Sequence, residues 1–367
     1  MTNILRRTTA AVLSAVMVLS LCLFTGCSES AKYEKYNDTF IDYFDTIISV
    51  ASYHKSPAEH ASFKQALKEE YSRLNQLYDI YNSYEGINNA KTINDNAGIA
   101  PVKVEEDLFD LVKFSLEWYH KTEGRVNVAM GSVLKIWHNV RTAAEGGYAA
   151  LPAIEKLEKA NEHTSIENIV LDEANMTVYI TDPDASLDLG AVAKGYATEL
   201  IADKLGETYP SFAISAGGNV KVHGSPMDGR TRWGVGITNP IVDENFSMAG
   251  GNIDLAYVAG DATIVCSGGY QRFIIVDGKR YHHLIDPQTL FPNNTYHGVT
   301  ILCEDSGVAD VLSTAIFMME KDDALAFINT IDNTECMLVT IDGKVYKTEG
   351  FNKYLESCGI NSKTPVE

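Results

Sequence analysis

The stretch from residue 264 to residue 314 places the strongest constraint on the fold, because its apolar runs are separated by clear turn signals. One run, residues 273–276, is followed at once by Asp277 and Gly278. An Asp-Gly pair after an apolar run is a strong signal for a β-hairpin. Pro287 has no N–H to donate to a sheet, so the returning strand, residues 281–285, is expected to end before it. The stretch therefore predicts antiparallel strands.

The end of the same stretch predicts a buried strand over residues 299–302 and a helix over residues 307–319. On that helix Asp310 and Thr314 are four residues apart, so both side-chain oxygens project from one face. Such a pair can hold a hard divalent cation such as Mg²⁺. The spacing alone favours a simpler interpretation, in which Asp310 complements the helix N-terminus and Thr314 bonds to the preceding turn.

The first half of the chain predicts helices flanked by strands. Ser56 followed by Pro57 is a typical helix start, with a capping side chain before a proline in the first helical position. The expected elements are a strand over residues 40–53, a helix from Pro57 to about Tyr81, a helix over residues 105–121, a helix after Pro152 and a hairpin over residues 168–182.

Two glycine-containing turns are candidates for close contact with a ligand. Residues 187–190 are expected to lead from a strand into a helix that starts at residues 191–195. The free N–H groups of a helix N-terminus, together with Lys194 in its first turn, attract phosphate. The glycines of residues 215–219 would let the backbone approach a ligand. Ordinary turn geometry explains both patterns equally well, so the patterns alone leave the choice open.

The first residues have the pattern of a bacterial export signal. Arg6 and Arg7 precede an apolar stretch, and residues 24–27, Phe-Thr-Gly-Cys, resemble a lipobox. The pattern predicts a signal over residues 1–26. A transmembrane anchor is the alternative, but the apolar run is short for a span and ends in small residues beside a cysteine.

The net charge excludes one class of function, and the spacing of the cysteines indicates the state of their thiols. The formal charge is −19, and it becomes −21 without Arg6 and Arg7, which excludes nucleic-acid binding. The remaining cysteines show no C-x-x-C spacing and are expected to be free thiols, mostly buried: Cys266, Cys303, Cys336 and Cys358. With 45% hydrophobic residues and no low-complexity linker, the chain is expected to form one two-lobed domain.

Five motifs, taken in order, resemble the ApbE family, the FAD:protein FMN transferases. They are LDLGAVAKG at 187–195, SAGGNVKVHG at 215–224, SGGYQRF at 267–273, YHHLIDP at 281–287 and ADVLSTA at 309–315. The resemblance implies an α+β fold: a single two-lobed domain over residues 39–360, with mixed, largely antiparallel sheets and flanking helices. Residues 27–38 would be a polar tether and residues 361–367 a polar tail.

The resemblance also implies the roles of individual residues. The expected FAD contacts are Phe44, Tyr81, Arg125, Val126, Asn127, Asp188, Lys194 and Ile285. Asp310, Thr314 and the backbone carbonyl of Ala191 would hold Mg²⁺, with Ser313 as a further candidate. His283 is the candidate general base, since imidazole titrates near neutral pH, and its neighbour His282 is the less favoured choice.

Three functions remain open after these motifs are considered. The leading one is transfer of the FMN part of FAD to a Ser or Thr hydroxyl of an exported protein, with release of AMP. The same metal site could instead activate water and hydrolyse FAD to FMN and AMP, or the protein could only bind FAD. In each case the resemblance implies a lipid on Cys27 that tethers the protein outside the cytoplasmic membrane.

Overall fold

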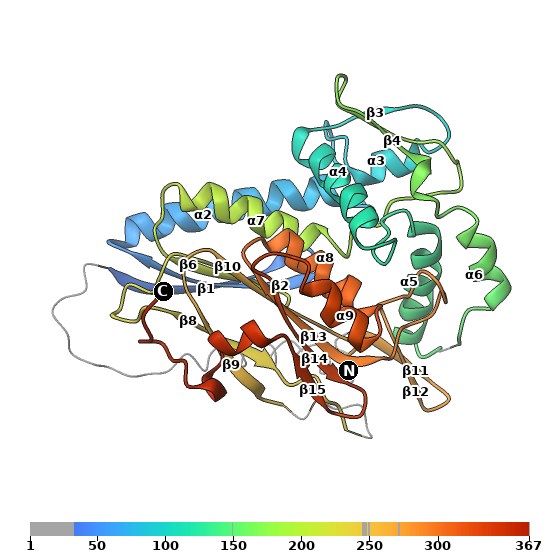
Figure 1. Cartoon of the computed structure of the whole chain (residues 1–367). Coiled ribbons are helices and arrows are strands. Elements are labelled where there is room, and N and C mark those ends of the chain that lie inside the picture. Colours follow the sequence, from blue (N-terminus) through green and yellow to red (C-terminus); the bar gives the residue numbers. More distant parts are fainter. Residues whose placement is uncertain (1–32, 149, 244–247, 249, 271, 367) are drawn as a thin grey trace.

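The centre of the structure, a computed structural model that describes residues 33–148, 150–243, 248, 250–270 and 272–366, is an eight-stranded sheet (Figure 1). All neighbouring strands in this sheet run antiparallel. From edge to edge they are β1 (Glu34–Tyr43), β2 (Thr46–His54), β6 (Phe212–Ala216), β7 (Asn219–His223), β10 (Ala262–Gly268), β13 (Tyr296–Cys303), β14 (Glu335–Thr340) and β15 (Val345–Lys347).

One face of this sheet is covered by helices (Figure 1). They are α2 (Pro57–Tyr78), α7 (Ala193–Gly206), α8 (Ser306–Phe317) and α9 (Lys321–Ile328). The predicted start of α2 is confirmed, because the Ser56 side chain accepts the Glu59 N–H and Pro57 is the first helical residue. The largest hydrophobic core lies between these helices and the sheet.

The other face of the sheet is covered by the hairpin of β8 (Trp233–Thr238) and β9 (Asn252–Val258). Successive strand residues point to opposite faces of a sheet. On β10, accordingly, Ile264 packs against this hairpin and Val265 packs under the helices. Because the central strands are covered on both faces, β13 is buried along its whole length, which explains why residues 299–303 are apolar except for Thr300.

A second lobe lies beyond one end of the large sheet (Figure 1). It contains α3 (Ala90–Asp95), β3 (Val102–Lys103), α4 (Glu106–Lys121), α5 (Gly131–Glu145), α6 (Ile154–Asn161), β4 (Ile169–Asp172) and β5 (Thr177–Ile180). Trp137 of α5 packs with Ile285 and Leu290, and its indole N–H donates to the Leu290 carbonyl at 2.9 Å. The predicted α+β class with largely antiparallel sheets and flanking helices is confirmed.

Three local predictions were wrong. Residues 40–53 form two strands rather than one, since Phe44 and Asp45 adopt left-handed backbone angles, with φ values of 53° and 48°, and turn the chain back. The hairpin of β11 (Phe273–Val276) and β12 (Lys279–His282) ends before residue 283, so His283 begins a loop. Residues 187–190 do lead into α7, which begins at Ala193, but β5 ends at Ile180 and does not run into them: Leu187 bonds to the Asn94 side chain instead.

The ends of the folded part differ slightly from the expected bounds. β1 begins at Glu34, inside the predicted tether. The predicted tail is bound to the start of β8, where Arg232 donates to the carbonyls of Thr364 and Pro365. The predicted signal and Cys27 lie outside the described residues. Within the described part of the chain, no helix has the length and apolar character needed to cross a membrane.

The four cysteines from residue 266 onward carry free thiols, as expected. Cys303 and Cys336 are buried in the sheet, and Cys266 is half-buried. Cys358, in contrast, is exposed near the C-terminus. The expectation of buried thiols therefore holds for the residues inside strands and fails for Cys358, which follows a short turn.

A buried ion pair fixes the start of α8 against the sheet. The ammonium group of Lys221, on β7, lies 2.7 Å from the Glu199 carboxylate and donates to the Glu304 carbonyl at 2.9 Å. Lys221 is only 1% exposed. The second oxygen of Glu199 accepts the Ser306 N–H at 2.6 Å. Burial raises the pKa of Glu199 although Lys221 is adjacent, which shows that desolvation of this carboxylate outweighs the attraction.

Replacing Lys221 by Met is expected to destabilise the fold by about 3–5 kcal/mol at pH 8, because the Glu199 carboxylate would stay buried without a cation. This loss of stability should become smaller as the pH is lowered towards 5. A carboxyl whose pKa is raised in the folded state stabilises that state only at acidic pH, and this contribution is lost as pH rises through the raised pKa. Urea unfolding at several pH values measures both effects.

The double variant Lys221→Met/Glu199→Gln provides the control for this prediction. It removes the buried charge as well as its partner, so it should recover much of the lost stability and all of the added pH dependence. If Lys221→Met unfolds like the unmodified protein at pH 8, the ion pair does not fix α8.

Candidate active site

The first turn of α7 meets the middle of α8 at Asp310. Helix α7 lacks a capping side chain of its own, because its N-cap residue is Val192. The Asp310 carboxylate takes this role from the neighbouring helix: its Oδ2 accepts the Gly195 N–H at 2.9 Å. The Lys194 ammonium group lies 3.1 Å from the same oxygen. Asp310 is 5% exposed, so this carboxylate is a buried charge with partners on another helix.

Glycine is required at position 195 by the closeness of the two helices. A Cβ atom there would lie 2.3 Å from the Ser306 carbonyl oxygen and 2.4 Å from the Asp310 Cβ. Both distances are far shorter than van der Waals contact. The helices could not meet at Asp310 with any larger residue at this position, so the glycine serves packing rather than chain flexibility.

The carbonyl of Ala191 lies four residues before Gly195. In a continuing helix it would accept the Gly195 N–H. That N–H goes to Asp310 instead, which leaves the Ala191 carbonyl without this partner. Among the described residues, the other Asp310 oxygen, Oδ1, is approached only by the Lys194 ammonium group, at 3.4 Å. A carboxylate oxygen and a carbonyl oxygen are thus left with acceptor capacity at the start of α7.

Thr314 and Ser313 follow Asp310 on α8 and have different surroundings. Ser313 is buried, donates to the Asp310 carbonyl at 2.8 Å and lies 2.8 Å from the Ser267 hydroxyl, so its hydroxyl is occupied in packing α8 on β10. Thr314 is half-buried and one turn beyond Asp310. The oxygen set of Asp310, Thr314 and the Ala191 carbonyl has the chemistry that Mg²⁺ prefers, so the residues present fit this ion.

The motif at 215–224 contributes to this site in a way that the sequence did not indicate. Its glycines form the turn between β6 and β7, and a Cβ at Gly217 would lie 2.2 Å from the Thr46 hydroxyl. Its polar residues hold α8: Asn219 accepts a hydrogen bond from the Ser306 hydroxyl at 2.9 Å, next to the Lys221 ion pair. The motif therefore positions the helix that carries Asp310.

His283 and His282 differ in the use of their ring nitrogens. His282 is 1% exposed; its Nε2 bonds to the Asn293 carbonyl at 2.7 Å and its Nδ1 accepts the Leu284 N–H at 3.2 Å. Burial lowers the pKa of His282 to about 4. The Nδ1 of His283 is buried with no hydrogen-bond partner in the described part of the chain. His282 is therefore occupied by the fold, whereas His283 has a nitrogen to offer.

The pKa of His283 is lowered to about 3. Burial is the main cause, and the positive charges of Arg272 and Arg141 add to it. His283 is consequently neutral at pH 7, which is the form that accepts a proton. His283 is therefore a weak base unless a bound anion offsets the positive charges of these arginines.

Several predicted FAD contacts lie around the same place. Tyr81 is 55% exposed, and its ring lies 5.3 Å from that of His138 on α5. Burial raises the pKa of Asp188, whose carboxylate accepts the Gly190 N–H at 2.9 Å and is attracted by Arg141. Phe44 sits in the β1–β2 turn, with its N–H on the Asn75 side chain.

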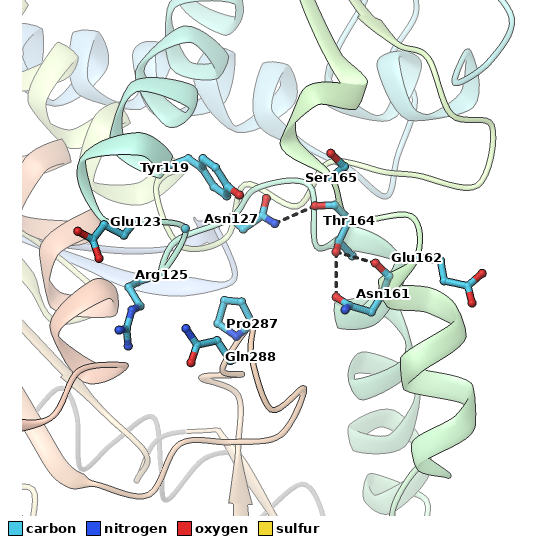
Figure 2. Close-up of a pocket in the computed structure, with 11 residues that line it drawn as sticks. Tyr119, Glu123, Arg125, Asn127, Asn161, Glu162, Thr164, Ser165, Pro287 and Gln288 are labelled. Carbon is cyan, nitrogen blue, oxygen red and sulfur yellow. Dashed lines mark hydrogen bonds between the residues drawn. The ribbon is translucent and has the colours of Figure 1, made fainter.

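Arg125 and Asn127 line a separate cavity of about 390 Å³ (Figure 2). Pro287 and Gln288, which follow the motif at 281–287, form another wall of it. Arg125 donates to the Met318 carbonyl at 2.6 Å, and the Asn127 side chain donates to the Thr164 carbonyl at 2.9 Å. The cavity therefore lies between the second lobe and the loop that carries His283.

The structure does not bring all predicted residues to these surfaces. The side chains of Val126 and Ile285 are buried in hydrophobic cores, at 4% and 6% exposure. Sequence reasoning missed three basic residues, His138, Arg141 and Arg272. Two of these follow Trp137 on one helix, and Arg272 lies within a quoted motif, but no spacing rule indicates that α5 and the loop after β10 meet.

Known proteins with similar sequences are flavin transferases. The model of the ApbE family matches residues 44–338. The FAD:protein FMN transferase of Treponema pallidum (strain Nichols) is 30% identical over 351 residues, which cover 91% of this chain and 92% of that protein. The FAD:protein FMN transferase of Vibrio cholerae O395 is 26% identical over 345 residues, covering 93% and 96%.

Solved structures with this fold come from the same family. The ApbE protein of Thermotoga maritima superposes with a TM-score of 0.73 at 27% identity, covering 88% of this chain and 99% of that one. The flavin transferase ApbE of Vibrio cholerae superposes with a TM-score of 0.72 at 23% identity, which shows the shared fold. Because the family model spans most of the chain, including His283 and the α7–α8 junction, this chain belongs to the ApbE family.

Proposed function

We propose that this chain is a Mg²⁺-dependent FAD:protein FMN transferase, which moves the FMN part of FAD to a Ser or Thr hydroxyl of an acceptor protein and releases AMP. The observation that carries the proposal is the α7–α8 junction, where Asp310 caps α7 and leaves oxygen acceptors at one place. Relatives named FAD:protein FMN transferase over nearly their whole length support the same activity.

The proposed reaction is a displacement at the phosphorus of the FMN half. The acceptor hydroxyl oxygen forms a bond to this phosphorus, and the anhydride bond to the AMP phosphate breaks. AMP leaves with the bonding electron pair, and the hydroxyl proton goes to His283. Such phosphoryl-type transfers depend mainly on alignment and on neutralising negative charge.

Charge neutralisation is assigned to the α7–α8 junction. Asp310, Thr314 and the Ala191 carbonyl would hold Mg²⁺, which supplies positive charge to the diphosphate of FAD. Lys194, in the first turn of α7, adds its ammonium group to the same region. Local cations are needed here because the chain carries a formal charge of −19, which repels a diphosphate.

Proton removal is assigned to His283. Its unpartnered Nδ1 is a free acceptor, and its low pKa keeps it neutral at pH 7. A bound diphosphate brings negative charge next to Arg141 and Arg272, and nearby negative charge raises the pKa of an imidazole. Substrate binding thus makes His283 a stronger base at the stage where the proton is transferred.

The remaining assignments concern FAD binding and location. Phe44 and Tyr81 are assigned to the flavin ring, and Asp188, Arg125 and Asn127 to the rest of FAD. Val126 and Ile285, whose side chains are buried, could contact FAD only through their backbone. The acceptor is an exported protein. We further propose that residues 1–26 are removed and that a lipid on Cys27 anchors the enzyme to the outer side of the cytoplasmic membrane.

The test of the activity is incubation of the protein with FAD, Mg²⁺ and a candidate acceptor, followed by intact-mass measurement. An acceptor that gains one FMN, with one AMP released, is the expected result. Free FMN and AMP with an unmodified acceptor would replace transfer by hydrolysis. FAD that stays bound and intact would leave only a flavin-binding protein.

Replacing Asp310 by Ala is expected to lower turnover with Mg²⁺ at least a hundredfold, because the metal would lose its only charged ligand. Transfer rates over a range of Mg²⁺ concentrations measure the effect. The control is Asp323→Asn, which removes an exposed carboxylate in the first turn of α9. Since Asp310 also caps α7, thermal unfolding must show that Asp310→Ala remains folded; full activity in the folded variant would remove the metal assignment.

Replacing His283 by Ala is expected to slow transfer at neutral pH about a hundredfold or more while leaving the Kd for FAD nearly unchanged. In the unmodified protein, kcat/KM should show no loss from His283 protonation between pH 8 and pH 5, because its pKa in the free protein is about 3. The value of kcat should decline at a higher pH than kcat/KM, since bound diphosphate raises this pKa. His282→Ala, which breaks a structural contact, serves as comparison; an unaltered rate in His283→Ala would mean that the base lies elsewhere.

A further inference from the structure

Arg141, near the end of α5, is a half-buried cation that the proposed assignments leave without a role. Its Nη1 is buried and has no hydrogen-bond partner in the described part of the chain. Burial lowers its pKa, as expected for a charge that has lost water without gaining a partner. An unpaired buried polar group costs free energy in the folded state. The position therefore needs an explanation outside packing.

Three groups around Arg141 come from separate segments of the chain. Tyr81 follows α2, Asp188 precedes α7, and His283 follows β12; each is close enough for its charge or dipole to interact with the guanidinium group. Asp188 attracts Arg141, but its carboxylate bonds to the Gly190 N–H. Asp188 is three residues before Ala191, so Arg141 interacts with the segment that leads into α7.

Arg272 places a second guanidinium group beside Arg141. It lies in the loop after β10 and donates to the Asp45 carbonyl at 2.9 Å. Its positive charge lowers the pKa of Arg141 and of His283. Two like charges close together destabilise the ligand-free protein. Neither arginine takes part in an ion pair with a described carboxylate, although the chain has 49 acidic residues.

We propose that Arg141, supported by Arg272, binds the phosphate groups of FAD and thereby selects FAD over flavins without a diphosphate. The inference rests on the proposed function and adds a residue to it. A guanidinium group offers a fork of N–H donors that matches phosphate oxygens. A diphosphate between the two arginines satisfies the unpartnered Nη1 and removes the repulsion.

The chemistry favours a phosphate over the flavin ring as the partner of Arg141. The flavin ring is uncharged, so it would satisfy a donor without relieving the repulsion between two cations. Each phosphate of FAD carries a negative charge. Hydrogen bonds between ionised partners contribute about 1.5–3 kcal/mol, which corresponds to roughly a tenfold to hundredfold change in Kd.

The test measures binding of FAD, FMN and riboflavin to the full-length chain by calorimetry, with a chelator present so that no metal contributes. Arg141→Gln removes the charge and keeps a polar side chain of similar reach. Lys135→Gln, an exposed residue on the same helix, removes the same charge and is the matched control. Arg141→Lys restores a point charge without the fork and should recover part of the affinity.

The expected result is that Arg141→Gln raises the Kd for FAD tenfold to hundredfold, raises that for FMN less, and leaves that for riboflavin unchanged. Lys135→Gln should leave all three values unchanged. An unchanged Kd for FAD would overturn the inference. So would an equal loss for FAD and riboflavin, because that pattern indicates a flavin contact or a disturbed fold.

Thermal unfolding provides a second measurement. If Arg141 had a structural role, its replacement would lower the Tm, whereas the proposed binding role predicts an unchanged or higher Tm. Without ligand, Arg141→Gln should unfold at the same temperature as the unmodified protein or a higher one, since an unpaired buried charge is removed. With saturating FAD its gain in Tm should be smaller. A lower Tm without ligand would make Arg141 a structural residue. If the unmodified protein fails to bind FAD, the proposed function itself is wrong; if it binds and transfers while Arg141→Gln matches it, only this inference is lost.

Discussion

The hydrogen bond from the Gly195 N–H to the Asp310 carboxylate determines how α7 and α8 meet, and the rest of the site depends on it. One carboxylate caps a helix that lacks its own cap, and it thereby turns the backbone before that helix towards α8. The absence of a side chain at Gly195 allows the contact. On the other side, the buried pair of Lys221 and Glu199 fixes the start of α8 against the sheet. The position of Asp310 is thus fixed both by its bond to α7 and by the ion pair that holds the start of α8.

The electrostatics of the site contrast with those of the whole molecule. A chain of charge −19 repels small anions in general, yet Arg141 lies close enough to Asp188 and His283, and Arg272 close enough to His283, for their charges to interact. Holding these groups near one another has a cost: the pKa values of Arg141 and His283 are lowered, mainly by burial and further by the positive charge of Arg272. The cost is offset when an anion enters. On the proposed assignments, the same groups bind a phosphorylated ligand, whose negative charge raises the pKa of His283.

Much of the fold could be predicted from the sequence because its signals are local. The Asp277-Gly278 turn, the Ser56-Pro57 helix start and the largely apolar second half of β13 each depend on neighbouring residues only. The errors arose where tertiary contacts override local preference. Phe44 is an ordinary strand residue by propensity, but its N–H is held by Asn75 and its backbone turns left-handed. Arg141 and Arg272, likewise, meet only because α5 packs beside the hairpin that follows β10.

The hydrogen bond from Arg272 to the β1–β2 turn bears on which substitutions this turn tolerates. The acceptor is the main-chain oxygen of Asp45, so the anchorage does not depend on the side chain at that position. The left-handed angle at Asp45 restricts replacements to residues that tolerate it, such as Gly or Asn. Homologous chains can therefore replace Asp45 by one of these residues while the hydrogen bond from the arginine to the main-chain oxygen is retained.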